Sequence, residues 1–449
     1  MSFFIRKFSA SVGLILILAF TAVAQSGRID NITEQAAHVS EFDVNGLKVL
    51  VKRRPTAPTV AGGLFIRGGA RNISEKNAGI ENLTLSTATE GGKRFPRTTL
   101  RRELSRLGSA VTSATGKDYS AISFISTRPN FDRVWELFAD VAIDPTFAVE
   151  DVNRVRSQIL TGIRESETNP DSALQALQDR MIYAQHPYAN DVTGTISAIG
   201  TLTPADLRAY HKNLMQTSRL LLVVVGDVDP AELKTRIAAT FGKLPRGTYN
   251  EQPLAQLDFS KGTLDIVTRT IPTNYIQGVF AAPSLSNPDY SAMRVATTIL
   301  QQMVFEEVRV RRNLSYAPNA ELNSMSANSA FIYVSAVDAN QAVRVMLDQI
   351  QALKTHDLSQ AALDAMASQF LTRYYMGQET NAAQAGELAR YELIGGGWRN
   401  TFEFLNRIRE VRSADVRRAA NKYMKNIRFV VIGDPRAVDR NLFLTTARP

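Results

Sequence analysis

The sequence predicts an α+β protein of two homologous domains, each a mostly antiparallel sheet covered by helices. The first observation is a repeat: an amphipathic helix near Pro204 leads to a strand ending in Gly-Asp, and the same order returns from Ser413. The strands concerned, residues 219–227 and 428–434, are continuous leucine and β-branched runs, which indicates central strands buried on both faces. Finally, strands precede helices in both halves, as in α+β folds.

The individual elements follow from local periodicity and turn signals. In the first half we expect strands at residues 42–52 and 59–67, and helices at 131–143, 151–167 and 172–184. In the second half we expect strands at 263–269 and 274–281, and helices at 292–311, 339–354 and 359–376. Thr203 and Ser413 are the expected N-caps of the repeated helices, because a hydroxyl there accepts a hydrogen bond from a free helical N–H.

A polar stretch containing Pro245, Gly247 and Pro253 marks the joint between the halves. We therefore expect an N-terminal domain over residues 26–249 and a C-terminal domain over residues 250–449.

The N-terminus is typical of a secretory signal peptide over residues 1–24. Arg6 and Lys7 precede an apolar segment, and small residues at Ala22 and Ala24 offer a cleavage site. We expect a periplasmic or secreted protein with no stable membrane span after cleavage. An uncleaved membrane anchor is the alternative, although the apolar segment is short for a span.

Composition narrows the function classes. The chain has 449 residues, no cysteine and a formal charge of +9. Without cysteine there can be no disulfide, thiolate metal ligand or thiol nucleophile. Because the basic excess is spread along the chain, it indicates solubility or weak attraction to anionic surfaces, and no nucleic-acid partner is expected.

Several motifs occur in a fixed order along the chain. They are Phe65-Ile66-Arg67-Gly68-Gly69-Ala70-Arg71, Gly79, Glu90-Gly91-Gly92-Lys93-Arg94, Ala110-Val111-Thr112-Ser113 followed by Asp118-Tyr119, and His186-Pro187-Tyr188. In this order and spacing the chain resembles the pitrilysin/insulinase family of zinc peptidases, in its two-domain bacterial form similar to mitochondrial processing peptidase. The resemblance covers essentially the whole chain after the signal peptide.

The zinc motif that this resemblance implies is missing. In the family it is Gly-x-x-His-x-x-Glu-His, which places two imidazoles one helical turn apart with a carboxylate to activate water. Here the His, Glu and His positions hold Asn82, Leu85 and Ser86, and the third ligand, a glutamate in the family, falls at Gly162. No histidine lies between residues 38 and 186. We therefore expect no metal bound by this chain and no hydrolysis by this chain alone.

One functional pair of the family is present. Arg309 and, seven positions later, Tyr316 resemble an Arg/Tyr pair that implies contact with the substrate backbone and stabilisation of the oxyanion. Without the resemblance, an Arg-rich helix end and a core tyrosine would be the ordinary interpretation. The resemblance also implies that a peptide lies along an edge strand formed by Ala110, Val111, Thr112 and Ser113.

These observations predict a catalytically incomplete subunit of a heterodimeric zinc peptidase of the bacterial cell envelope. A partner chain of similar fold would hold the zinc ion. This chain would close the substrate chamber and supply Arg309 and Tyr316 for hydrolysis of peptides or unfolded polypeptides. The alternative is a non-catalytic peptide-binding or scaffolding protein, as a homodimer.

Overall fold

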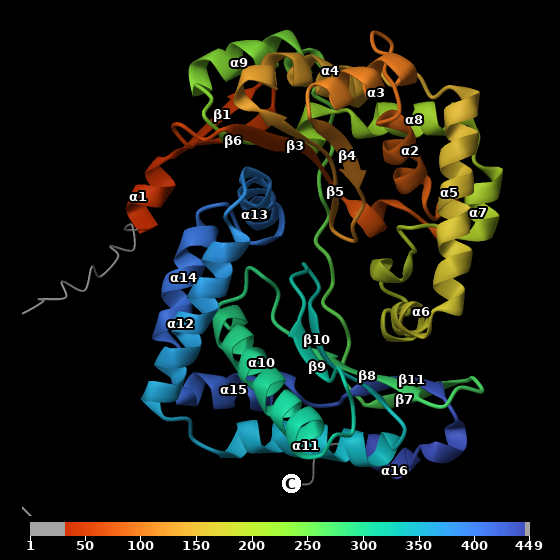
Figure 1. Cartoon of the computed structure of the whole chain (residues 1–449), viewed down its shortest axis with the longest axis vertical. Helices are drawn as coiled ribbons and strands as arrows, with labels where there is room; N and C mark the ends of the chain where they lie inside the picture. The colour runs from red at the N-terminus through yellow and green to blue at the C-terminus, as the bar shows by residue number, and fades with distance from the viewer. Residues whose placement is uncertain (1–31, 445–449) are drawn as a thin grey trace, which may run out of the picture.

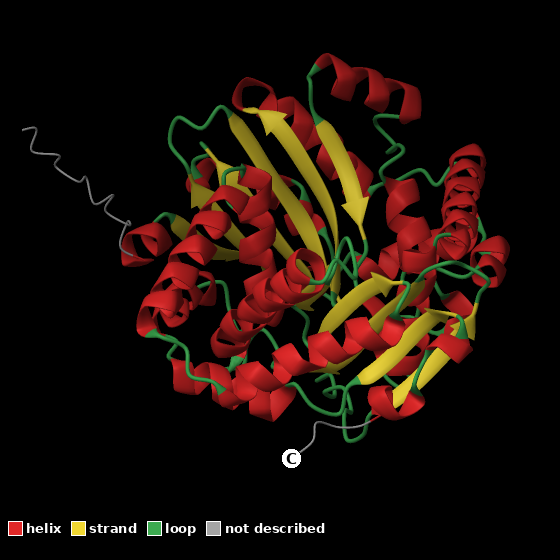
Figure 2. Cartoon of the chain, turned by 60° about the horizontal axis from the view of Figure 1, so that its bottom comes forward, coloured by secondary structure: helices red, strands yellow, loops and turns green. Residues whose placement is uncertain are grey.

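Two sheets, one in each half of the chain, organise the structure (Figure 1). The computed structural model describes residues 32–444, so the predicted signal peptide lies outside the described residues. Figure 2 shows the two sheets as separate groups of strands with helices lying across each of them. The predicted α+β class with two mostly antiparallel sheets is confirmed.

The first sheet has the strand order β1-β2-β6-β3-β5-β4. Only β2 and β6 pair in parallel, and the other neighbours are antiparallel. Every residue of β6 is buried, as the sequence predicts for a central strand. The strands are β1 (Val39–Val44), β2 (Leu47–Arg53), β3 (Thr59–Arg67), β4 (Ala110–Ala114), β5 (Tyr119–Thr127) and β6 (Leu220–Gly226).

The second sheet repeats this topology without the first strand. Its order is β7-β11-β8-β10-β9, and again only one pair, β7 with β11, is parallel. Position by position, this order matches β2-β6-β3-β5-β4. The strands are β7 (Thr263–Thr268), β8 (Asn274–Ala281), β9 (Asn319–Leu322), β10 (Ser329–Ala336) and β11 (Arg428–Gly433).

Helices of each half cover the outer face of its own sheet. In the first half, Phe124 of β5 packs against Trp135 and Phe138 of α4. In the second half, α10, α11 and α15 pack together over the sheet. The first-half helices are α1 (Ile32–Ala37), α2 (Ile80–Ala88), α3 (Arg97–Arg106), α4 (Phe131–Ile143), α5 (Val149–Thr168), α6 (Pro170–Ile182), α7 (Ile196–Thr201), α8 (Pro204–Leu214) and α9 (Pro230–Ala239). The second-half helices are α10 (Tyr290–Val304), the π-helix η7 (Phe305–Arg311), α11 (Ala339–Thr355), α12 (Gln360–Gly377), α13 (Asn381–Ile394), α14 (Asn400–Glu410), α15 (Ser413–Tyr423) and α16 (Arg440–Leu444).

The inner faces of the sheets are covered by an exchange of helices between the halves. Helix α13 of the second half packs against β3 and β6, where Leu388 joins a buried cluster with Phe65 and Val223. Helix α6 of the first half packs against β8 and β11, where Leu177 meets Val430. Each sheet therefore needs the other half to bury its inner face.

The prediction of one strand over residues 42–52 is wrong. Asn45 and Gly46 both have positive φ, of 53° and 83°, and they turn the chain into a hairpin of β1 and β2. An Asn-Gly pair is a strong hairpin signal, since both residues tolerate the left-handed conformations of a type I′ turn.

Two helix details also differ from expectation. The predicted helix over residues 292–311 is an α-helix only to Val304 and continues as the π-helix η7 to Arg311. Thr203 caps α8 as predicted, with its hydroxyl accepting from the Asp206 N–H. Ser413 is not a cap: it is the first residue of α15, and its hydroxyl accepts from the Leu358 N–H and donates to Asp357.

Candidate functional site

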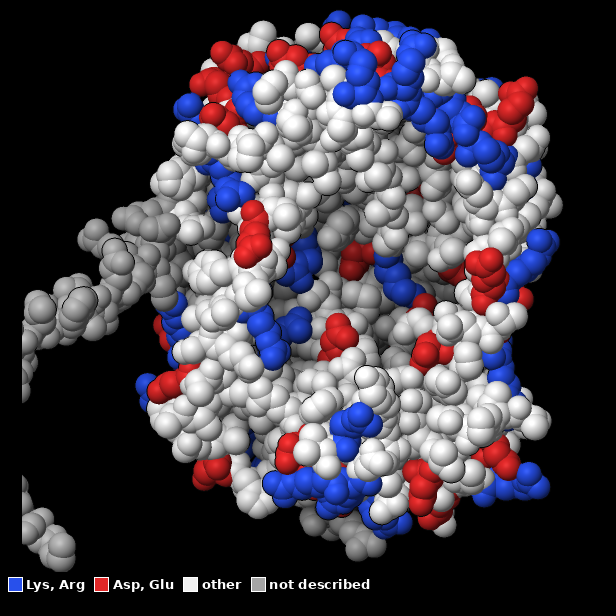
Figure 3. All heavy atoms as spheres, viewed as in Figure 1, with Lys and Arg blue, Asp and Glu red and all other residues white. Residues whose placement is uncertain are grey.

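The two halves enclose a hollow on one face of the molecule. Figure 3 shows it between the upper and lower halves, with acidic and basic side chains around it. A cavity of about 820 Å³ also lies between the halves. Its walls include Lys48 and Arg71 of the first half and Ser284 and Trp398 of the second. The cavity between the halves is thus lined by polar residues and is large enough to take a ligand.

Helix α2 holds Asn82, Leu85 and Ser86, the three positions where the resemblance to zinc peptidases implies the His-x-x-Glu-His motif. It begins after Gly79, whose φ of +83° and whose close approach to Gly194 exclude a side chain. Asn82 Nδ2 donates to the Thr193 carbonyl at 3.0 Å, and Ser86 Oγ donates to Asn82 Oδ1 at 3.3 Å. Leu85 is fully buried in the core.

The other first-half site residues lie on elements that pack against α2. Helix α5 and strand β4 both contact it. Gly162 is exposed on α5, and a side chain there would meet no atom within 4 Å. Strand β4, with Ala110, Val111, Thr112 and Ser113, is the edge of the first sheet, so its outer backbone groups are unpaired by strands.

These positions do not fit a zinc ion. An amide, a buried leucine, a hydroxyl and a glycine offer neither imidazole nor carboxylate. Within residues 32–444, no group of three or more His, Cys, Asp or Glu side chains is placed to hold a metal. In the same range no helix is long and apolar enough to cross a membrane.

Glu81, next to the first of these positions, is engaged elsewhere. Its buried carboxylate accepts hydrogen bonds from Ser120 and from Tyr210, the latter at 2.7 Å, and lies 3.9 Å from Arg219. Burial raises the pKa of Glu81, against the effect of these three partners. Nothing in the sequence pattern predicts this cluster, since Ser120, Tyr210 and Arg219 lie far from Glu81 in the chain.

Arg309 and Tyr316 lie against each other. The guanidinium carbon of Arg309, in the π-helix η7, lies 4.3 Å from the centre of the Tyr316 ring. Tyr316 is 79% exposed, so the interpretation of an ordinary core tyrosine is wrong. Among the described residues, neither the guanidinium nor the phenol makes a hydrogen bond or an ion pair. No direct polar contact joins this pair to α2 within residues 32–444.

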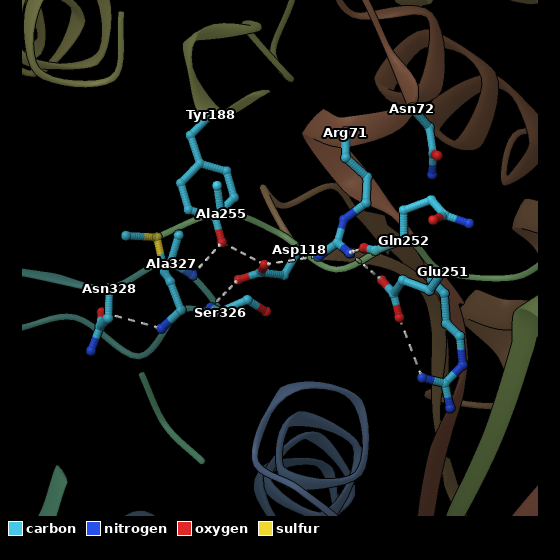
Figure 4. A network of polar contacts seen from close by, with 12 residues as sticks. Arg71, Asn72, Asp118, Tyr188, Glu251, Gln252, Ala255, Ser326, Ala327 and Asn328 are labelled. Atoms are coloured by element: carbon cyan, nitrogen blue, oxygen red, sulfur yellow. Dashed lines mark hydrogen bonds and ion pairs between the residues drawn. The ribbon is translucent and has the colours of Figure 1, made fainter. Parts of the chain in front are cut away.

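A buried network ties the halves together beside the cavity (Figure 4). Asp118 accepts a hydrogen bond of 2.5 Å from the Tyr188 phenol and one of 3.1 Å from the Ser326 N–H. Arg71 lies 3.6 Å from Asp118 and 3.2 Å from Glu251 of the segment that joins the halves. Burial, followed by the charge of Asp118, raises the pKa of Tyr188.

His186 precedes this network and has a structural role. Its Nδ1 accepts from the Tyr188 N–H at 3.1 Å, and its Nε2 lies 3.0 Å from the Ala255 carbonyl. Burial lowers the pKa of His186. Asp118 and Tyr188 belong to the motifs that carry the resemblance to zinc peptidases, but their hydrogen bond is not predictable from sequence, because it depends on how the two halves pack.

Comparison with known protein families identifies both parts of the chain. Residues 48–196 match the model described as insulinase (peptidase family M16), and residues 201–370 match the model described as peptidase M16 inactive domain. An uncharacterized zinc protease of Mycobacterium leprae is 22% identical over 84% of this chain and 87% of its own length. The beta subunit of the mitochondrial-processing peptidase of Blastocladiella emersonii is 22% identical over 87% of each chain.

Further similarities extend to a respiratory complex and to solved structures. Subunit 1 of the bovine mitochondrial cytochrome b-c1 complex is 24% identical over 58% of this chain and 55% of its own length. A peptidase M16 inactive domain from Pseudomonas fluorescens has a TM-score of 0.81 at 21% identity, covering 88% of this chain and 98% of its own. A protease from Helicobacter pylori reaches the same TM-score at 17% identity. With both family models matched in sequence and the fold shared, this chain belongs to the insulinase family of peptidases, peptidase family M16.

Proposed function

We propose that this chain is the catalytically incomplete subunit of a heterodimeric zinc peptidase of the cell envelope. A partner chain of similar fold holds the zinc ion and the activated water. This chain closes the substrate chamber and contributes Arg309 and Tyr316 to the partner's active site, for the hydrolysis of peptides or unfolded polypeptides. The relatives named as a zinc protease and as a processing-peptidase subunit support the class of reaction.

The observation that carries the proposal is the contact of half-buried Arg309 with exposed Tyr316, neither of which bonds to another described side chain. A guanidinium stacked 4.3 Å from an aromatic ring is held in orientation without using its N–H donors. The phenol is equally unused among the described residues, and the ring is exposed. Two donors that no other described group of this chain uses are free to bind an oxyanion that belongs to another chain.

The loss of metal ligands supports the division of labour. Ser86 donates to Asn82, Asn82 donates to the Thr193 carbonyl, and Leu85 is buried in the core, so these three side chains of α2 are engaged in packing and internal hydrogen bonds. A subunit that has lost the Lewis acid but kept oxyanion donors needs a partner to be of use in hydrolysis.

The test begins with co-purification of this chain from its native host, followed by metal analysis of each chain in the complex. Arg309→Ala and Tyr316→Phe variants are then compared with wild type in the reconstituted complex. We expect kcat to fall by about 100-fold for each, the usual cost of losing an oxyanion donor. Unchanged kcat in both variants would refute the proposal.

Matched controls separate this role from general damage. Arg311→Ala removes a neighbouring arginine of η7 that is paired with Glu306 at 3.2 Å, and Tyr375→Phe alters another exposed tyrosine. Both should leave kcat within about twofold of wild type, since surface ion pairs contribute little.

A second candidate is a non-catalytic peptide-binding or scaffolding protein, acting as a homodimer. The similarity to subunit 1 of the bovine cytochrome b-c1 complex favours it, because that relative is named as a component of a larger complex. Isolation of a homodimer that binds unfolded peptide, with no metal-bearing partner, would support this candidate.

A further inference from the structure

A second cavity lies in the C-terminal half, away from the Arg309–Tyr316 pair. Its volume is about 460 Å³, within the range of small-molecule sites. It is bounded by α11, by the start of β11 with the segment before it, and by α16. The family comparisons assign nothing to it, and neither the proposed hydrolysis nor the interface between the halves uses it.

The floor of this cavity is apolar. Ile350, Phe429 and Phe443 are buried, and the two phenylalanine rings meet edge to face with centres 4.9 Å apart. Leu347 lies on the rim side of α11. The lining residues of α11 run from Arg344 to Lys354, which corresponds to a trough about 15 Å long at the rise of an α-helix.

Two lysines close one end of the trough. Lys354 lies in the last turn of α11, and Lys425 follows the end of α15. Neither amine makes a hydrogen bond or an ion pair with another described residue. Burial, followed by repulsion from Lys425, lowers the pKa of Lys354. Two like charges share this end without a carboxylate between them.

The helix ends account for only part of this charge. The C-terminus of a helix is equivalent to about half a negative charge, so the ends of α11 and α15 offset about one of the two lysines. The remaining charged groups of the lining are Arg344, Asp348 and Asp439. Within residues 32–444 Asp439 forms no ion pair, and its N–H donates to the Asn340 side chain near the start of α11, away from Lys354. Among the described residues no carboxylate forms an ion pair with Lys354 or Lys425, so both amines are available to an anionic ligand.

We propose that this trough binds a monocarboxylate with an apolar body, the carboxylate between Lys354 and Lys425 and the body along Leu347, Ile350, Phe429 and Phe443. A carboxylate there forms charge-assisted hydrogen bonds with both amines. The apolar body of the ligand covers the apolar side chains of the trough, and the burial of this surface favours binding. The same chemistry is offered by a fatty acid and by the C-terminus of an apolar peptide.

Calorimetric titration of the full chain with sodium octanoate and with 1-octanol tests the site. We expect octanoate to bind at one site per chain, and a Lys354→Gln, Lys425→Gln double variant to bind it about 100-fold more weakly, the loss expected for two charge-assisted hydrogen bonds. Octanol binding should change by less than about twofold, since it lacks the charge. Equal octanoate affinity in wild type and the double variant, or no saturable heat in wild type, would overturn the proposal.

Further variants locate the site and exclude a general charge effect. Lys212→Gln removes one exposed lysine of α8 and should leave octanoate affinity unchanged. Leu347→Glu keeps both lysines but places a carboxylate in the trough, and octanoate binding should be lost while the melting temperature is followed as a check on folding. Octanoate binding that survives Leu347→Glu would place the ligand elsewhere and overturn the proposal.

The source of the carboxylate is resolved by a second pair of probes. An acetylated Leu-Leu-Phe peptide is titrated with a free and with an amidated C-terminus. If the free-acid peptide binds more tightly than octanoate, the result supports the site and identifies a peptide C-terminus as its ligand. If octanoate binds more tightly, the result supports the site and identifies a fatty acid as its ligand. The titrations are repeated on a chain ending at Leu444, because the following residues lie outside the described part. Octanoate binding by this shorter chain but not by the full chain would overturn the proposal.

Discussion

The indole N–H of Trp398 donates a 2.8 Å hydrogen bond to the carboxylate of Glu41, joining strand β1 of the first half to the loop after α13 of the second. The same carboxylate lies 2.9 Å from Lys48 and 3.2 Å from Arg399. Because α13 covers the inner face of the first sheet, this contact fastens the exchanged helix at its C-terminal end.

This contact predicts a pH-dependent stability. The hydrogen bonds from Trp398 and Lys48 lower the pKa of Glu41 to about 2 from its ordinary value of 4.5. A carboxyl whose pKa is lower in the folded state stabilises the fold above its unfolded pKa and loses that contribution as pH falls toward its folded pKa. Glu41→Gln should therefore reduce the free energy of unfolding at pH 7 by about 1 kcal/mol, a figure discounted for solvent screening.

Urea unfolding at pH 7, 5, 4 and 3 checks this prediction. The difference between wild type and Glu41→Gln should be constant down to about pH 5 and then shrink as pH falls further. Glu165→Gln, at an exposed position of α5, serves as the control and should show no such trend. A difference that persists undiminished at pH 3 would contradict the assignment.

Removal of the buried carboxylate between the halves should be much more costly. Asp118→Ala leaves Arg71 without one of its two carboxylate partners and deprives the Tyr188 phenol and the Ser326 N–H of their acceptor. Breaking a buried pair in this way costs about 3–5 kcal/mol. Asp132→Ala, which removes an exposed ion pair with Arg236, should cost under about 1 kcal/mol. Similar unfolding midpoints for the two variants in urea would show that the network is not a major contribution.

The regular elements of the fold are predictable from local patterns. The buried run of β6, the Thr203 cap and most helix positions follow from hydrophobic periodicity and from capping chemistry within a few neighbouring residues. The hairpin at Asn45 and Gly46 was also predictable, because its signal is equally local, but the apolar residues on both sides of the turn favour one longer strand.

The exchange of α6 and α13 between the halves could not be predicted in the same way. Both helices are amphipathic or apolar segments that fit any hydrophobic surface, and only the assembled sheets show which surface each one covers. For the same reason, the contacts of Glu81 with Tyr210 and of Asp118 with Tyr188 could not be predicted from the sequence. They join residues far apart in the chain, and no local spacing indicates them.

Gly162 should be replaceable with a gain in stability. It lies within α5, and a Cβ there would meet no atom within 4 Å. Glycine in a helix interior costs about 1 kcal/mol relative to alanine, chiefly through backbone entropy. Gly162→Ala should therefore raise the free energy of unfolding by about 0.5–1 kcal/mol, measured by urea titration. A loss of stability would mean that this face of α5 is packed against something.

Leu85 should behave in the opposite way, although the resemblance to zinc peptidases implies a metal-site role for both positions. Its side chain is fully buried among core residues, so Leu85→Ala should cost about 2–5 kcal/mol through lost contacts and a cavity. Leu85→Glu, which would restore the family's acid, should cost at least as much, because burial opposes ionisation of an unpaired carboxyl. Chemical denaturation of both variants measures this, with Leu85→Met as the volume-conserving control expected to lose less than about 1.5 kcal/mol. If Leu85→Glu is as stable as wild type, the glutamate side chain can reach solvent, and α2 has kept the orientation of a metal-binding helix. A clear loss of stability means that the core has closed over this position. In that case, histidines at positions 82 and 86 would not by themselves rebuild the site.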